Sequence, residues 1–219
     1  EPLIREAAQV FAGVMGADPV AICLTGGDLS LIPELGLTLL RALVLTPGVS
    51  HMYTARDETG TLVGFILFSL PGQLMLSTWE QRENAKLNEF MSKLSPEGQA
   101  FYAETMMKLL PEANDEAFGM HETERNTYWC NFAMVRLDYQ GKGVAKSLFE
   151  LAFEKADKLG QHVALTTTNI RNVPIYKKIG FQYYGEKHME SPWTPWSLWF
   201  FKRAPSGSNS GNATAQQGV

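Results

Sequence analysis

The stretch that decides the fold is NFAMVRLDYQGKGVAKSLFELAFEKADKL, residues 131–159. Its first part, Phe132 to Val135, is apolar and predicts a β-strand. The chain then passes through Gly141 and Gly143, after which apolar residues recur at the spacing of a helix. These apolar residues are Val144, Leu148, Leu151, Ala152, Ala156 and Leu159. The stretch therefore predicts a strand, a glycine-bearing turn and an amphipathic helix.

A turn of this kind before a helix forms a cradle for an anion. The N–H groups of the turn converge, and the helix dipole adds positive potential at the first helical turn. Gly141 and Gly143 let the backbone approach a phosphate because they have no Cβ. Two common nucleotide-binding fingerprints do not fit: Lys146 stands where G-x-G-x-x-G needs its last glycine, and the P-loop spacing is absent.

Two motifs carry a resemblance to a known family. The turn reads Gln140-x-x-Gly143-x-Ala145, which resembles the Q/R-x-x-G-x-G/A signature of the GNAT (Gcn5-related) N-acetyltransferases. Alone, this motif is equally compatible with an ordinary strand-to-helix connection. The segment NIRNVPIYKKIGF, from Asn169 to Phe181, resembles the family's later N-x6-Y-x3-G-F segment, one helix and one strand downstream. With both motifs in the right order, the chain is similar to a GNAT from about residue 51 to residue 202.

The resemblance implies an α/β (α+β) fold of the GNAT type, with a central mixed, mostly antiparallel, twisted sheet flanked by helices. We expect a single domain over residues 1–203 and a flexible tail over residues 204–219, which has no core-forming residues. Residues 73–125 are expected to form a helical insertion between the third and fourth strands. We interpret this insertion as a cover near the acceptor side; the alternative is that it only thickens the fold.

The remaining elements follow from periodicity and capping signals. Helices are expected near residues 3–15, 31–44, 81–94, 95–111, 144–159 and 172–178. Strands are expected near residues 50–56, 61–69, 128–135, 162–167, 182–189 and 197–202. Residues 18–24 are expected to form a loop or short strand, and residues 112–124 are acidic and turn-like.

Net charge, cysteine spacing and the length of apolar runs argue against several classes of protein. The net charge is −4 without a long basic run, which disfavours nucleic-acid binding. Cys23 and Cys130 match no metal spacing, which suits buried thiols in a reducing compartment, or a single bridge. The apolar run over residues 31–44 is too short and interrupted to span a membrane. No signal peptide is visible, and we expect a cytoplasmic monomer or homodimer.

The resemblance also implies acetyl-CoA as co-substrate, with no metal. The family's pantetheine arm pairs with the strand before the cradle, where one free N–H stabilises charge on the thioester carbonyl. The residues that would bind the cofactor by this correspondence are Ala133, Met134, Val135, Gln140, Gly141, Lys142, Gly143, Val144, Ala145, Asn169, Asn172, Tyr176 and Lys178.

Tyr176 matches the family's tyrosine that protonates the leaving thiolate, a role that suits a phenol held beside the sulfur. The alternative is a half-buried aromatic residue whose hydroxyl binds a backbone carbonyl. Many relatives carry a glutamate eleven positions ahead of Gln140, but here that position is Trp129, and we assign no base. The residues considered for the role are His51, His121, Glu122, Glu124 and His188.

The resemblance therefore implies an acetyl-CoA-dependent N-acetyltransferase that acts on the primary amine of a small molecule by direct attack on the thioester. Three alternatives are a protein or peptide acetyltransferase, a non-catalytic acyl-CoA-binding module, and use of a different acyl donor. Aromatic residues could line an apolar acceptor pocket, although such residues are usually core packing. They are Trp79, Tyr128, Trp129, Trp193, Trp196 and Trp199.

Overall fold

The computed structural model of the protein describes residues 1–16 and 18–207. Its helices are α1 (Pro2–Met15), α2 (Pro19–Leu24), α3 (Ile32–Val44), α4 (Trp79–Ala85), α5 (Leu87–Met91), α6 (Pro96–Phe101), α7 (Leu110–Phe118), α8 (Thr123–Asn126), α9 (Val144–Leu159) and α10 (Val173–Ile179). Shorter helical segments are η1 (Leu29–Leu31), η2 (Tyr102–Leu109, π-helical), η3 (Leu137–Tyr139) and η4 (Ile170–Asn172). The strands are β1 (Ser50–Arg56), β2 (Leu62–Ser69), β3 (Tyr128–Val135), β4 (Val163–Thr167), β5 (Gln182–Met189) and β6 (Trp196–Arg203). Most of the expected tail, residues 208–219, lies outside the described residues.

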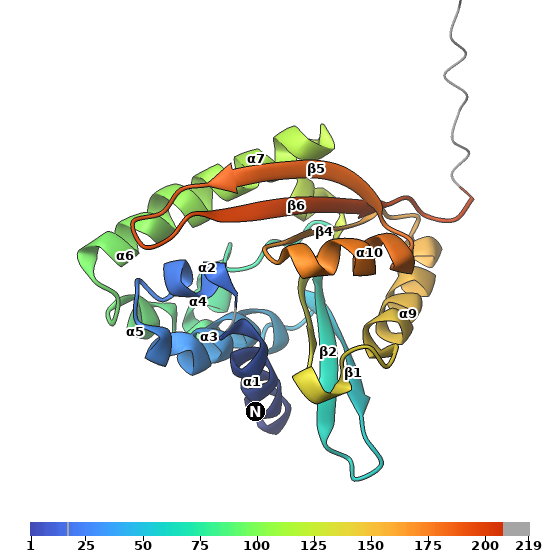
Figure 1. The fold of residues 1–219 in the computed structure, drawn as a ribbon, viewed down its shortest axis with the longest axis horizontal. Helices are drawn as coiled ribbons and strands as arrows, with labels where there is room; N and C mark the ends of the chain where they lie inside the picture. The colour runs from blue at the N-terminus through green and yellow to red at the C-terminus, as the bar shows by residue number, and fades with distance from the viewer. Residues whose placement is uncertain (17, 208–219) are drawn as a thin grey trace, which may run out of the picture.

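The six strands form one sheet in the order β1-β2-β3-β4-β6-β5. Every neighbouring pair is antiparallel except β3 and β4, which are parallel. Figure 1 shows that β1 and β2 run upright, whereas β4, β6 and β5 run across the top of the molecule. This mixed, mostly antiparallel and twisted sheet flanked by helices is the one that the resemblance implies, so that expectation is confirmed.

Each face of the sheet carries its own core. Successive side chains of a strand point to opposite faces, and β2 shows this alternation. Phe65 and Leu67 pack with α1, α2, α3 and the insertion, on what we call the α1 face. Ile66 and Phe68 pack with α9 and α10, on what we call the α9 face. The sheet is therefore buried on both sides, with different helices on each.

Residues 19–24 form helix α2, so the expected loop or short strand is wrong. The Asp18 side chain accepts a hydrogen bond from the Val20 N–H, and Pro19 occupies the first helical turn. Both features favour a helix start. Because residues 18–24 add no strand, the insertion lies between the second and third strands of the described chain, β2 and β3.

The insertion is helical, as predicted, but its helices have different limits. Lys86 adopts a left-handed conformation (φ 56°) and divides the expected single helix into α4 and α5. Pro111 does not end the next helix, which continues through η2 into α7 and reaches Phe118. In η2 the N–H of Leu110 bonds to the carbonyl of Thr105, five residues earlier. This wider turn relieves the clash between a proline ring and the preceding turn, so the stretch expected to be turn-like is partly helical.

The insertion packs on the α1 face. Phe90, Phe101, Ala113 and Phe118 belong to the same core as α1 and α3. Phe118 contacts Trp129 of β3 at a ring-centroid distance of 6.4 Å. Within the described residues, no helix is both long and apolar enough to cross a membrane.

Candidate functional site

The candidate site is a gap between the parallel strands β3 and β4. Only two residue pairs join them, Tyr128 with Val163 and Trp129 with Ala164. Beyond these pairs the strands separate, and Figure 1 shows the upright and transverse parts of the sheet spreading apart. Strand edges that face such a gap leave backbone N–H and C=O groups that need other partners.

A bulge lies where the gap opens. Leu67 of β2 is paired with Phe132, but the next residue, Phe68, is paired with Cys130, so Asn131 is the extra residue. The Asn131 side chain donates a hydrogen bond to Ser69 Oγ (2.8 Å). Bulges of this kind redirect backbone groups and often lie next to active sites.

The three predicted pantetheine-binding residues follow the bulge. Ala133, Met134 and Val135 are paired with β2 on one edge, and no β4 residue is paired with their other edge. In an antiparallel pair, every second residue directs its N–H and C=O away from the partner strand. The free edge of β3 therefore offers backbone groups to a ligand in the gap, and the binding role of these residues stays a prediction.

The turn before α9 has the geometry of an anion cradle. Gly141 and Gly143 have positive φ values of 74° and 84°, and a Cβ added at either would meet no atom within 4 Å. No side chain caps α9, and its first turn contains no acidic residue. Because uncapped N–H groups and the helix dipole favour an anion, these residues fit a diphosphate.

Side chains on either side of this turn shape it. Gln140 donates from Nε2 to the carbonyl of Val135 (3.0 Å), which ties the turn to the end of β3. The Lys142 ammonium lies 4.5 Å from the centre of the Tyr139 ring. Val144 and Ala145 begin α9 and are half-buried. Lys142 is thus the cation of the turn itself.

Tyr176 lies on α10 at the α9 face of the gap. Its ring is buried against Phe149 and Phe201, with centroid distances of 5.8 and 5.3 Å. Burial, with a smaller effect of the nearby Cys130 thiol, raises the pKa of Tyr176 above its ordinary value. Tyr176 shares this buried core with Cys130, the first β3 residue beyond the last β3–β4 pair.

The Tyr176 hydroxyl is free to donate. Among the described residues, neither a backbone carbonyl nor a side chain accepts a hydrogen bond from it. The alternative in which this hydroxyl binds a backbone carbonyl is therefore not what the structure contains. A protonated phenol at this place can give a proton to a ligand atom in the gap.

The other residues of the second motif shape the start of α10. Asn169 accepts a hydrogen bond from the Arg171 N–H (3.1 Å), and Asn172 donates to Thr167 Oγ1 (3.0 Å). Lys178 is exposed, and among the described residues it has no hydrogen bond or ion pair with the turn before α9. The roles of Asn169, Asn172 and Lys178 toward a cofactor stay predictions.

The position of the family's glutamate holds no titratable group, because Trp129 is buried there in the core of the α1 face. Of the five residues considered as a base, Glu124 is the one whose pKa is raised, to about 7, chiefly by burial. Asn114 donates to Glu124 Oε1 (2.7 Å) and accepts from the Thr166 hydroxyl of β4 (2.8 Å). Glu124 is therefore connected to β4 through Asn114 and Thr166.

The other four are less suited to the role. The side chain of His121 is 91% exposed, and Glu122 pairs with Arg125 at 3.3 Å. His51 bonds to the Tyr128 hydroxyl (2.9 Å), and His188 bonds to Ser197 Oγ (2.8 Å). These residues hold ordinary structural or surface positions.

Sequence reasoning missed Asp18. The Thr168 hydroxyl, directly after β4, donates to Asp18 Oδ2 at 2.9 Å. Burial is the main cause that raises the pKa of this carboxyl above its ordinary value. The sequence signal, an aspartate before Pro19, indicates a helix cap and contains nothing about Thr168.

The aromatic residues considered for an acceptor pocket are distributed differently. Tyr128, Trp129 and Trp196 are core residues, whereas Trp79 is 75% exposed. Trp193 packs on Phe101 with a ring-centroid distance of 5.6 Å. These six residues do not form one aromatic pocket.

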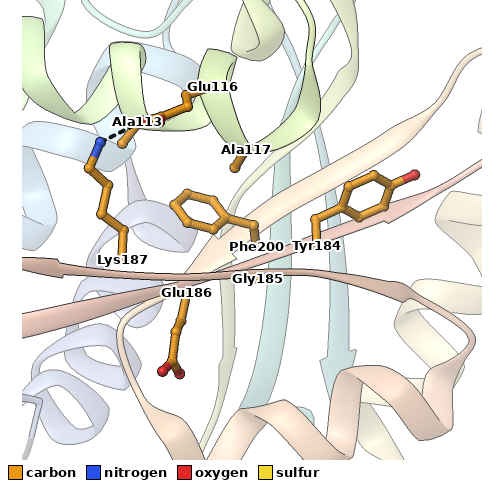
Figure 2. Close-up of a pocket in the computed structure, with 8 residues that line it drawn as sticks. All are labelled: Ala113, Glu116, Ala117, Tyr184, Gly185, Glu186, Lys187 and Phe200. Atoms are coloured by element: carbon orange, nitrogen blue, oxygen red, sulfur yellow. Dashed lines mark hydrogen bonds and ion pairs between the residues drawn. The ribbon is translucent and has the colours of Figure 1, made fainter.

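Two cavities lie outside the gap. One, of about 300 Å³, lies between α7, β5 and β6, where Lys187 pairs with Glu116 above Phe200 (Figure 2). The other, of about 150 Å³, lies between α1 and η3. Neither contains a residue of the two motifs. Among the described residues, no three His, Cys, Asp or Glu side chains are grouped to hold a metal ion.

Comparison with known sequences agrees with these motifs. The family model described as "Acetyltransferase (GNAT) domain" matches residues 75–195, more than half of the 219 residues. A Schizosaccharomyces pombe protein described as an uncharacterized N-acetyltransferase is 29% identical over 127 residues. That match covers 58% of this chain and 50% of the yeast protein, so the chain spans about half the length of that relative.

Comparison with one solved structure supports the fold. A Corynebacterium glutamicum protein described as histone acetyltransferase HPA2 and related acetyltransferase has a TM-score of 0.61 at 14% identity. That match covers 94% of this chain and 93% of the other. A nourseothricin acetyltransferase has a TM-score of 0.43 at 17% identity, over 73% of this chain and 68% of the other.

Proposed function

The chain belongs to the GNAT acetyltransferase family, and on that premise we propose that it transfers an acetyl group from acetyl-CoA to the primary amine of a small molecule. The observation that carries the proposal is the gap after Trp129 and Ala164. The uncapped N-terminus of α9 follows the far end of β3, and Tyr176 shares a core with Cys130, the first residue of β3 beyond the last pair. The free edge of β3 thus connects a cradle for a diphosphate with a proton donor.

Each part has one task in this reaction. The turn from Gln140 to Ala145 binds the diphosphate, and the free edge of β3 binds the pantetheine arm. An N–H beside the Asn131 bulge stabilises charge on the thioester oxygen, where loss of one donor commonly costs about 10²–10³ in rate. Tyr176 gives its proton to the departing sulfur, a role that suits a phenol held beside that sulfur.

The choice of a small acceptor rests on the walls of the α1 face. Three segments contact one another there: α2, the insertion, and the loop between β5 and β6. Tyr102 donates to the Leu24 carbonyl (2.9 Å), and Cys23 lies 3.1 Å from Ser191 Oγ. Both cysteines are buried free thiols, which favours a reducing, cytoplasmic location.

A two-stage experiment tests the proposal. Acetyl-CoA should raise the melting temperature, because a ligand that binds only the folded state stabilises it. Release of free CoA thiol is then measured with a panel of small primary amines and with a panel of peptides. Turnover with the small amines supports the proposal. Turnover with peptides alone favours a protein acetyltransferase, and binding without any turnover favours a non-catalytic acyl-CoA-binding module.

A further inference from the structure

Two threonines, Thr166 of β4 and Thr168 directly after it, make hydrogen bonds on the α1 side of β4. Thr166 donates to Asn114 of the insertion, and Thr168 donates to Asp18. Thr168 directly follows β4 and precedes Asn169, a residue expected to bind the cofactor. Asp18 is therefore bound to the chain just beyond the end of β4, where the pairing of β4 with β3 has already ended.

The Asp18 carboxylate is held in one orientation. Its Oδ1 accepts from the Val20 N–H (3.1 Å) and its Oδ2 accepts from the Thr168 hydroxyl (2.9 Å). A carboxylate has about four lone-pair sites, so these two bonds leave others for a ligand. Pro19 fixes the backbone that carries it.

This carboxylate has no cationic partner. Among the described residues, no Lys, Arg or His forms an ion pair with Asp18. The nearby titratable group is the Cys23 thiol, whose pKa is raised by burial and, to a smaller extent, by the Asp18 charge. A half-buried carboxylate without a cationic partner gains from a ligand that supplies the opposite charge.

On the basis of the proposed function, we propose that Asp18 is the specificity residue of the acceptor site and binds the ammonium group of an alkylamine. It lies on the α1 face, whereas Tyr176 lies on the α9 face, so the acceptor and the leaving sulfur occupy opposite sides of the gap. The acceptors are then amines that bind in their charged form at neutral pH and give one proton to solvent before the neutral amine attacks the thioester carbonyl. Arylamines, which are already neutral at that pH, gain nothing from Asp18.

The test compares Asp18→Asn with the matched variant Asp28→Asn. Both aspartates accept a hydrogen bond from an N–H two residues ahead, at Val20 and Ser30. Asparagine is about as good a cap as aspartate, so both variants should fold. The full chain is assayed at pH 7.5 with benzylamine and tryptamine, which are charged, and with aniline, which is neutral.

Asp18→Asn should raise KM for the charged amines about 10- to 100-fold, the effect of losing one charge-assisted hydrogen bond. It should change KM for aniline less than about threefold, and the dissociation constant of acetyl-CoA should stay unchanged. Asp28→Asn should behave as the unsubstituted protein with all three amines. If Asp18 only stabilised the fold, its substitution would not change KM for charged amines more than KM for a neutral amine.

Equal losses with benzylamine and aniline would overturn the inference and leave the proposed function standing. The same holds if aniline is acetylated and neither alkylamine is, while acetyl-CoA still raises the melting temperature. Failure of acetyl-CoA to bind the unsubstituted protein would instead overturn the proposed function, and the inference with it.

Discussion

Trp129 and Ala164 form the last pair of the β3–β4 ladder. The Asn131 bulge follows two residues later on β3, and the Cys130 thiol between them lies near the Tyr176 phenol. The end of one short ladder therefore determines where the gap begins and where backbone groups are left free.

Replacing Tyr176 with Phe should lower kcat about 10²-fold or more, because the leaving sulfur loses its proton donor. The ring contacts with Phe149 and Phe201 remain, so the melting temperature and the affinity for acetyl-CoA should hardly change. Assays of CoA release measure kcat, and calorimetric titration with acetyl-CoA measures the affinity. Tyr183→Phe is the control, since Tyr183 also packs on Phe201 (5.5 Å) but lies on β5. An unchanged kcat in the Tyr176 variant would remove this residue from the reaction.

Glycines at the two ends of α9 allow a matched test of the cradle. Gly143 and Gly160 both have positive φ values, 84° and 64°, and a Cβ would meet no atom within 4 Å at either. Alanine should cost about 1 kcal/mol of unfolding free energy at both positions. Only Gly143→Ala places a methyl group where the diphosphate would bind, so only this variant should weaken acetyl-CoA binding, about tenfold or more. Equal affinities in the two variants would mean that the turn does not hold the diphosphate.

The cradle and α10 could be predicted from sequence because each is encoded locally. Gly141 and Gly143 mark a turn, and the apolar spacing after them marks one helix face. The resemblance of two spaced motifs then implied the fold, a mixed, mostly antiparallel sheet flanked by helices. Helix α2 was missed because a six-residue apolar segment fits a strand as well as a helix, although Asp18 and Pro19 are a helix-start signal.

The α1 side of the gap could not be predicted in the same way. The contact between Asp18 and Thr168 joins residues 150 positions apart, and neither belongs to a family motif. Likewise, Pro111 is an ordinary stop signal in sequence, and only the π-helical turns before it let the helix continue. Both features depend on tertiary packing, which local patterns do not encode.

We propose that residues 1–203 unfold as one domain, with the insertion as part of it. Phe118 joins the insertion to the sheet through Trp129 and Phe200, with ring-centroid distances of 6.4 and 5.9 Å. Phe118→Ala should therefore lower the unfolding free energy by about 3–5 kcal/mol.

The control Met107→Ala removes a side chain of the insertion that is 65% exposed, and should cost less than about 0.5 kcal/mol of unfolding free energy. Urea unfolding followed by tryptophan fluorescence and by circular dichroism measures both. Separate transitions for the two probes would show instead that the insertion is an independent unit.

Glu124 should make the protein less stable as the pH rises. Its pKa is raised to about 7, first by burial and then by the charge of Asp115, against the hydrogen bond from Asn114. In the unfolded chain a glutamate titrates near pH 4.3. Between these two values the folded state binds more protons than the unfolded state, so this group lowers the unfolding free energy with increasing pH, and its full cost is reached above pH 7.

Glu124→Gln removes that titration and keeps an oxygen for Asn114. At pH 8 the variant should therefore be more stable than the unsubstituted protein, by on the order of 3 kcal/mol, and the difference should shrink toward pH 5. Urea unfolding at pH 5, 6, 7 and 8 gives the two curves. Glu104→Gln is the control, because this substitution makes the same chemical change at a glutamate that is exposed on η2. If the curves of Glu124→Gln and the unsubstituted protein run parallel over this range, Glu124 is ionised in the folded state at all four pH values, and its burial does not control its charge.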